Sequence, residues 1–246
     1  MRIGEFNLKL LENAPNYEKD NCTQPFEVTA TLANSAILYD SPTLDGILSW
    51  AVIAEVTQGR GLPDTAEPYF IPLPLQRLWT CPDTLAPLWN ATQFFPLEES
   101  VQHTVFWHKR GYRPELIKRK KMRGIEKPHN PSFRTGPLKE YRIPMPRQSC
   151  LQWRAYGVGD MECIMQLLKT VGYLGKKRTQ GFGTIANWNI QKITEIDYFH
   201  NGQFIKSFPI DYPNIPEPPS GVTFSRYEAG WTPPYWYAGL YRPCIL

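Results

Sequence analysis

Apolar and polar residues alternate in several short stretches of the chain, with the period of two that a half-buried β-strand requires. The first such stretch runs from Phe26 to Leu32, and in the last one Ala186, Trp188 and Ile190 alternate with two asparagines. Two further stretches lie between them. We therefore predict four strands, at residues 26–32, 101–107, 151–156 and 186–190.

Two other stretches have the spacing of an amphipathic helix. Apolar residues recur three and four apart from Leu44 to Val52, which predicts a helix over 42–56 with Ser41 as its N-cap and Pro42 in its first turn. A second helix is expected to begin after Asp160 and to end at Gly172. Its apolar face consists of Ile164, Leu167, Leu168 and Val171.

The resulting order is strand–helix–strand–strand–helix–strand, which predicts an α+β fold with a ferredoxin-like βαββαβ core. Residues 57–100 are expected to form an irregular insertion with short strands, and His200–Gln203 a hairpin turn between two further strands. We expect one domain over residues 1–208. Residues 209–246 are expected to be a proline- and aromatic-rich tail with little helix or strand that packs on the main body.

Composition excludes several classes of protein. The chain has 246 residues, of which 42% are hydrophobic, and this is enough for a core. The sequence contains no run of 18 apolar residues, and residues 1–20 lack the apolar centre of a signal peptide. Five scattered cysteines without Cys-x-x-Cys spacing fit a reducing cytosol rather than a disulfide framework. We expect a cytoplasmic protein with no membrane association, metal or cofactor.

The net charge of +4 is unevenly distributed along the chain. From His108 to Arg147 there are 13 lysines and arginines against three acids. Residues from about 109 to 140 are expected to form a long mobile excursion that either is a plain solvated surface run or contacts a polyanion. The centre of this basic excursion carries Lys118, Arg119, Lys120, Lys121 and Arg123.

A glycine-rich loop over residues 172–183 joins the second predicted helix to the last predicted strand. Glycine allows a backbone to approach a ligand closely, lysine and arginine bind phosphates, and aromatic rings stack on bases. The loop therefore predicts a nucleic-acid-binding site. Its candidate residues are Gly172, Tyr173, Gly175, Lys176, Lys177, Arg178, Gly181, Phe182 and Gly183.

Two other interpretations of this loop can be weighed. A phosphate-binding P-loop precedes a helix, whereas this loop follows one, so side-chain cations must replace the helix dipole. A purely structural interpretation makes Gly172 the helix cap and uses Gly181 and Gly183 for a tight turn.

The element order, the loop and the basic excursion together resemble the CRISPR-associated RAMP superfamily of guide-RNA-binding proteins. The family's loop has the form Gly-x-Gly-Lys/Arg-x(several)-Gly-x-Gly, and the excursion resembles the thumb of its 5′-handle-binding (five-type) subunit. Residues 41–51 resemble the opening of the first helix in the type IV version, and residues 231–236 resemble its Pro-Pro-Tyr-Trp tail. Both stretches also have a structural interpretation, in which Asp45 favours a helix N-terminus and 233–236 is a packing clamp.

The resemblance implies a non-catalytic subunit of an RNA-guided surveillance complex in antiviral defence. Such a subunit binds the 5′ handle of the guide RNA, nucleates the filament of backbone subunits, and lies beside the large subunit, where target DNA is contacted. Its implied partners are the guide RNA, the backbone subunits, the large subunit and the target DNA. The segment 57–100 has no counterpart in this pattern.

Two alternatives remain open at this point. The first is a metal-independent endoribonuclease that processes repeat RNA, for which His103, His108, Tyr141 and Lys118 are the candidate acid–base and cationic groups. The second is a generic ferredoxin-like RNA-binding module, although the chain lacks the aromatic strand signature of that class.

Overall fold

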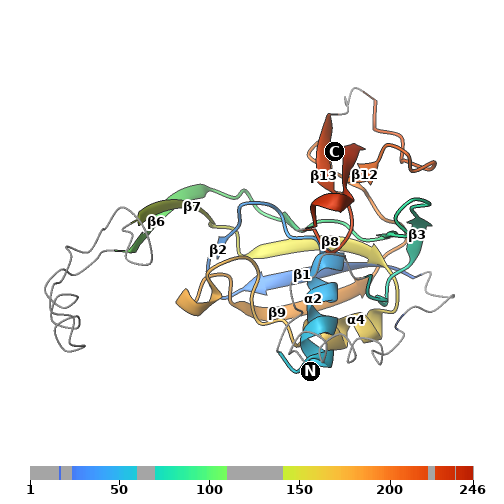
Figure 1. The fold of residues 1–246 in the computed structure, drawn as a ribbon. Helices are drawn as coiled ribbons and strands as arrows, with labels where there is room; N and C mark the ends of the chain where they lie inside the picture. The colour runs from blue at the N-terminus through green and yellow to red at the C-terminus, as the bar shows by residue number, and fades with distance from the viewer. Residues whose placement is uncertain are drawn as a thin grey trace, which may run out of the picture.

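The structure is a computed structural model that describes residues 17, 24–59, 70–109, 141–220, 225–235 and 237–245. These residues form a mixed α/β fold of two α-helices and mostly antiparallel strands (Figure 1). None of the helices in these ranges is long and apolar enough to cross a membrane. The predicted basic excursion lies outside the described residues, and so do Lys118, Arg119, Lys120, Lys121 and Arg123.

A four-stranded antiparallel sheet forms the centre of the molecule, in the spatial order β5-β8-β1-β9 (Figure 1). Three of its strands match predicted strands, and the fourth, β5, is only two residues long. Helix α2 follows β1, and α4 follows β8. The bounds are β1 Pro25–Leu32, α2 Leu44–Val56, β5 Phe95–Pro96, β8 Gln152–Val158, α4 Met161–Leu168 and β9 Ile185–Lys192.

The main core lies between this sheet and the two helices. Phe26, Val28 and Ala30 alternate along β1 and are fully buried, so they share one face of the sheet. The apolar stripes of α2 and α4 pack into the same cluster, which contains Leu44, Leu48, Val52, Ile164, Leu167 and Leu168. The helical periodicity in the sequence therefore identified the buried faces correctly.

Both helices differ from prediction at one end. The N-cap of α2 is Thr43 rather than Ser41, and its hydroxyl accepts from the Gly46 N–H at 3.2 Å. The chain before Leu44 is extended because it pairs with residues 92–94: the Pro42 carbonyl accepts from the Phe94 N–H at 2.7 Å. Helix α4 ends at Leu168, before Gly172, and Asp160 caps its start as expected.

The predicted second core strand lies in a different sheet. Strand β6 (Gln102–Lys109) pairs with β7 (Tyr141–Gln148), which also pairs with β2 (Ala36–Ile37), and β6 and β7 project from the body of the molecule (Figure 1). The assignment of residues 101–107 to the central sheet was therefore wrong. Strand β7 was missed because Pro144 and Pro146 interrupt it. Residues two apart in a strand direct their N–H groups to the same edge, so these two prolines remove donors from one edge of β7 only. The other edge can still pair with β6.

A further sheet and a second core lie in the C-terminal part of the chain. The sheet has the order β12-β14-β13, so the expectation of a tail with little strand was wrong. Proline did not prevent pairing, because the Pro243 carbonyl accepts from the Ile210 N–H at 3.1 Å. The bounds are β12 Phe208–Pro209, β13 Arg226–Gly230, the 3₁₀ turn η3 Ala238–Leu240 and β14 Tyr241–Ile245.

Aromatic side chains from this region pack on the segment that was predicted to be irregular. Trp231 is 1% exposed and its ring centre lies 5.8 Å from that of Trp79. As expected, the described part of the segment 57–100 beyond α2 contains only short strands, β3 (Arg77–Thr80), β4 (Pro87–Trp89) and β5. The predicted hairpin turn is confirmed between β10 (Phe199–His200) and β11 (Gln203–Phe204).

Candidate nucleic-acid interface

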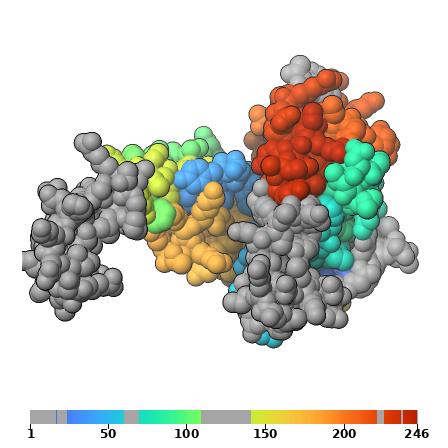
Figure 2. All heavy atoms as spheres, viewed as in Figure 1, coloured from blue at the N-terminus to red at the C-terminus, as the bar shows by residue number. Residues whose placement is uncertain are grey.

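The glycine-rich loop is a defined structure that is fixed to the edge of the central body. The Lys176 N–H donates to the Ile37 carbonyl at 2.9 Å, and the Gly183 N–H donates to the Ser35 carbonyl at 3.0 Å. The side-chain oxygen of Asn34 accepts from the Thr184 N–H at 3.1 Å. These hydrogen bonds tie both ends of the loop to β2 and to the turn before it, on the surface that the space-filling view shows (Figure 2).

Three glycines of the loop take positive φ angles, and two of them are needed for its own packing. A Cβ on Gly175 would lie 2.6 Å from the Ile37 carbonyl oxygen, and one on Gly183 only 1.9 Å from that of Leu174. Gly181 also has positive φ, but the space around it is open. Gly172 has an ordinary φ, so it is not the left-handed helix cap of the structural interpretation.

The middle of the loop presents backbone N–H groups as well as side-chain cations. Lys177 has the left-handed conformation (φ 65, ψ 33), and Arg178 follows it in the 3₁₀ turn η2 (Arg178–Gln180). A left-handed residue beside a right-handed one points successive N–H groups into a concavity that suits an anion. Among the described residues, no group accepts from the N–H groups of Lys177, Arg178 or Thr179.

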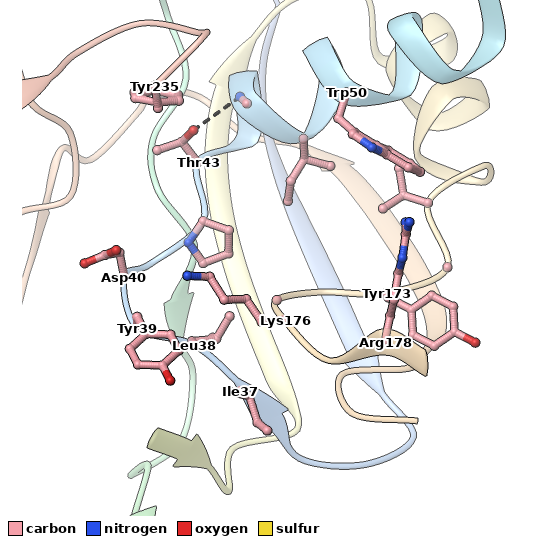
Figure 3. Close-up of a pocket in the computed structure, with 16 residues that line it drawn as sticks. Ile37, Leu38, Tyr39, Asp40, Thr43, Trp50, Tyr173, Lys176, Arg178 and Tyr235 are labelled. Carbon is pink, nitrogen blue, oxygen red and sulfur yellow. Dashed lines mark hydrogen bonds between the residues drawn. The ribbon is translucent and has the colours of Figure 1, made fainter. Parts of the chain in front are cut away.

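A pocket of about 410 Å³ opens beside the loop (Figure 3). We call it the loop pocket. Its walls come from the linker between β2 and α2, from the first turns of α2 and from the glycine-rich loop. It is lined by Ile37, Leu38, Tyr39, Asp40, Pro42, Thr43, Gly46, Ile47, Trp50, Val171, Gly172, Tyr173, Gly175, Lys176, Arg178 and Tyr235.

Five of the nine predicted loop residues therefore line one pocket: Gly172, Tyr173, Gly175, Lys176 and Arg178. The other four do not. Gly183 is buried, Gly181 and Phe182 are half-buried outside the pocket, and the Lys177 ammonium lies over the ring of Trp107 in β6. The Lys176 ammonium lies 4.6 Å from the ring centre of Tyr39, so cation–π contacts orient two of the three cations.

The loop pocket also contains residues that the sequence did not single out. The most prominent is Trp50, whose side chain lies on α2 outside the apolar stripe and is 45% exposed. In Figure 3 its indole faces the loop, and the Arg178 side chain extends toward it. The sequence did contain a signal for Trp50: it lies outside the buried face of an amphipathic helix, where packing in the core does not explain a tryptophan.

A buried polar cluster supports the wall of the loop pocket. Asp45 is fully buried at the start of α2, and both of its carboxylate oxygens accept from the Tyr235 hydroxyl at 2.9 Å. Burial raises the pKa of Asp45, and the nearby Lys206 opposes this effect. Lys206 is 4% exposed and donates to the Ala91 carbonyl at 2.8 Å, and burial lowers its pKa to about 8.

This cluster predicts a specific pH dependence of stability. The folded-state pKa of Lys206 is about 8, below its ordinary value of 10.5, so above pH 8 the unfolded chain binds more protons. Relative to Lys206→Met, the wild-type protein should therefore gain up to about 1.4 kcal/mol of unfolding free energy per pH unit from pH 8 to 10. Urea titrations of both proteins at pH 7, 8, 9 and 10 measure this difference, and a pH-independent difference would contradict the assignment.

The structure offers no metal centre in the ranges it describes: it groups no three His, Cys, Asp or Glu residues that could hold an ion. His103 and His108 are both exposed on β6, and in the register they lie opposite Arg147 and Arg142. The five basic residues of the predicted thumb lie outside the described residues, as noted above, and their assignment stays a prediction.

The family comparison covers nearly all of this architecture. The model of the family described as CRISPR type IV associated protein Csf3 matches residues 24–245, from the residue before β1 to the end of β14. The glycine-rich loop, the loop pocket and the Asp45–Tyr235 pair all lie within the match. No curated protein matches the chain.

Proposed function

Because the chain belongs to the family of CRISPR type IV associated protein Csf3, we propose that it is the subunit of a type IV complex that binds the 5′ handle of the guide RNA. Membership of the family makes it a component of a CRISPR type IV complex. The proposal assigns it the non-catalytic role of holding the handle and nucleating the filament of backbone subunits. Target sequence would be read by guide pairing, with this chain close to the DNA beside the target.

One observation carries the proposal: the glycine-rich loop combines a fixed backbone, three cations and N–H groups that donate to no described residue. The hydrogen bonds to Ser35 and Ile37 hold the loop in place before any ligand binds. Preorganised donors lose little entropy on binding, so they favour a phosphate backbone strongly. The mixed arrangement of N–H groups and side-chain cations suits a bent single strand.

We also propose that the central sheet is the ferredoxin-like core of the RAMP superfamily. The spatial order β9-β1-β8-β5 becomes fourth-first-third-second if β5 is counted as the second strand. In that assignment α2 and α4 are the two crossover helices on one face, and β6 and β7 form the base of the thumb. The thumb residues Lys118, Arg119, Lys120, Lys121 and Arg123 would then contact the guide RNA or the target DNA.

The handle proposal is tested by the RNA that the assembled complex retains. The chain is co-expressed with its complex partners and a repeat–spacer RNA, the complex is purified, and both ends of the bound RNA are sequenced. We expect RNA of uniform length with one fixed repeat-derived 5′ end. RNA with random 5′ ends, or no RNA, would contradict handle binding while leaving the family assignment intact.

The proposal also predicts that the purified chain does not cut RNA. His103 and His108 are five positions apart on one strand, a span of about 17 Å, so the two rings cannot act on one scissile phosphate. Repeat RNA incubated with the protein in EDTA should stay intact. Site-specific scission that disappears in His108→Ala, but not in a surface variant such as Arg226→Ala, would establish the endoribonuclease alternative instead.

A further inference from the structure

The loop pocket has a composition that a phosphate-binding surface alone does not need. Three aromatic side chains on its wall are nearly half exposed: Tyr39 at 46%, Trp50 at 45% and Tyr173 at 43%. They come from three different elements, the linker before α2, the helix α2 itself and the glycine-rich loop. Three large exposed rings on the wall of one pocket form an aromatic patch, and such a patch is typical of a binding site rather than of scattered surface residues.

We propose that the loop pocket holds one unpaired base of the bound RNA, stacked on the indole of Trp50, while Lys176 and Arg178 hold the phosphates on either side. This inference rests on the proposed function, because it assumes that RNA reaches the loop. It specifies that the ligand is a single strand with one base turned out of its stack, since a base within a duplex cannot enter a pocket.

Size and charge both fit this occupant. The volume of about 410 Å³ lies within the roughly 300–1,000 Å³ that small-molecule sites occupy. The side walls are apolar and aromatic, as a base face requires, through Ile47, Val171 and Leu38 as well as the three exposed rings. In Figure 3 Lys176 extends from the loop toward Tyr39 and Asp40, and Arg178 extends toward Trp50. The two cations therefore lie in different directions from the loop and can hold the phosphates before and after an inserted base.

One wall of the pocket is fixed by close packing around Gly46 and by the hydrogen bonds of Tyr235. A Cβ on Gly46 would lie 2.8 Å from the Thr43 hydroxyl and 3.2 Å from the Tyr235 ring, so only glycine fits there. The hydrogen bonds from Tyr235 to Asp45 hold that ring in place. The wall therefore exists before RNA arrives, and binding a base requires little rearrangement.

The inference is tested by pairing an abasic scan of the handle with Trp50 variants of the assembled complex. Each handle nucleotide is replaced in turn by an abasic site, and the affinity of wild type, Trp50→Phe and Trp50→Ala is measured. One abasic position should weaken wild-type binding between about fivefold and a hundredfold. Trp50→Ala should weaken the binding of intact handle RNA by a similar factor, and Trp50→Phe should weaken it less. In the Trp50→Ala variant, the abasic change should cause little further loss of affinity.

Tyr241→Ala is the matched control, because Tyr241 is 48% exposed but lies outside the loop pocket. This variant should respond to the abasic change as wild type does. Equal sensitivity at all handle positions, or additive effects of Trp50→Ala and the sensitive abasic site, would overturn the base pocket. If the complex binds no handle RNA in any variant, the proposed function fails instead, so the two failures are distinguishable.

Discussion

Replacing Lys176, Lys177 and Arg178 with alanine is expected to weaken the binding of handle RNA about 100-fold at 0.1 M salt. Each phosphate neutralised on a single strand contributes about 0.7 to the slope of log K against log salt, so three lost contacts should reduce that slope by about 2. The neighbouring N–H groups remain, so binding should fall but not vanish. Filter binding or fluorescence anisotropy from 0.05 to 0.5 M salt measures both the affinity and the slope.

The control for this variant removes the same charge elsewhere. Lys169, Lys192 and Arg226 are exposed and do not line the loop pocket. Their triple alanine variant should change the affinity much less, since it affects only the general field of the protein. If both triple variants lose the same affinity and the same slope, the loop has no special part in binding, and the assignment of the interface is wrong.

Gly183→Ala is expected to have the largest effect of any single substitution in the loop. Positive φ is unfavourable for alanine by about 1–2 kcal/mol, and overlap of its Cβ with the Leu174 carbonyl should add about 1–3 kcal/mol. Because Leu174 is buried, the loop must shift to relieve the overlap. Handle-RNA affinity should therefore fall at least tenfold along with stability, as measured by urea unfolding and RNA titration.

Gly181→Ala separates the two causes. Gly181 has a similar positive φ, but no atom would lie within 4 Å of an added Cβ. The Gly181→Ala variant should lose only the conformational penalty of about 1–2 kcal/mol in unfolding free energy, and its affinity for handle RNA should stay close to that of wild type. Equal losses in the two variants would show that the close approach at Gly183 does not shape the interface.

Local patterns in the sequence predicted the parts of the fold that are buried on one face. The strand at Phe26–Leu32 and both helices were found because burial imposes a period on apolar residues. The same logic failed for β6, since alternation predicts a strand but does not select its sheet. Strands β7 and β14 contain prolines, and only the tertiary arrangement supplies edges that tolerate them.

The candidate site was predicted in part for a similar reason. Glycines and cations are contiguous in residues 172–183, so the loop could be recognised locally. Trp50 and Tyr39 reach the loop pocket only because α2 and its linker pack against the loop. Nothing in their spacing along the chain relates them to Arg178, and therefore the sequence suggested only Tyr173 and Phe182 for stacking, of which Tyr173 lines the pocket and Phe182 does not.

Two stretches that resembled the type IV subunit turn out to contact each other. Asp45, in the first, accepts hydrogen bonds from Tyr235, in the second. Asp45 is fully buried and Tyr235 is partly buried, and the two lie 190 residues apart in sequence, so their hydrogen bonds connect the start of α2 to the C-terminal region. Its role is to fix the wall shared with the loop pocket, which agrees with the structural interpretation of both stretches.

Cross-linking of the assembled complex tests the central proposal most directly. Ultraviolet irradiation joins stacked aromatic side chains to the bases they contact, and mass spectrometry identifies the joined peptide and nucleotide. We expect the peptides that contain Trp50 or residues 172–183 to carry nucleotides from the repeat-derived 5′ end of the guide. Cross-links from these peptides to spacer nucleotides, or their absence while other parts of this chain cross-link to the handle, would contradict the proposal.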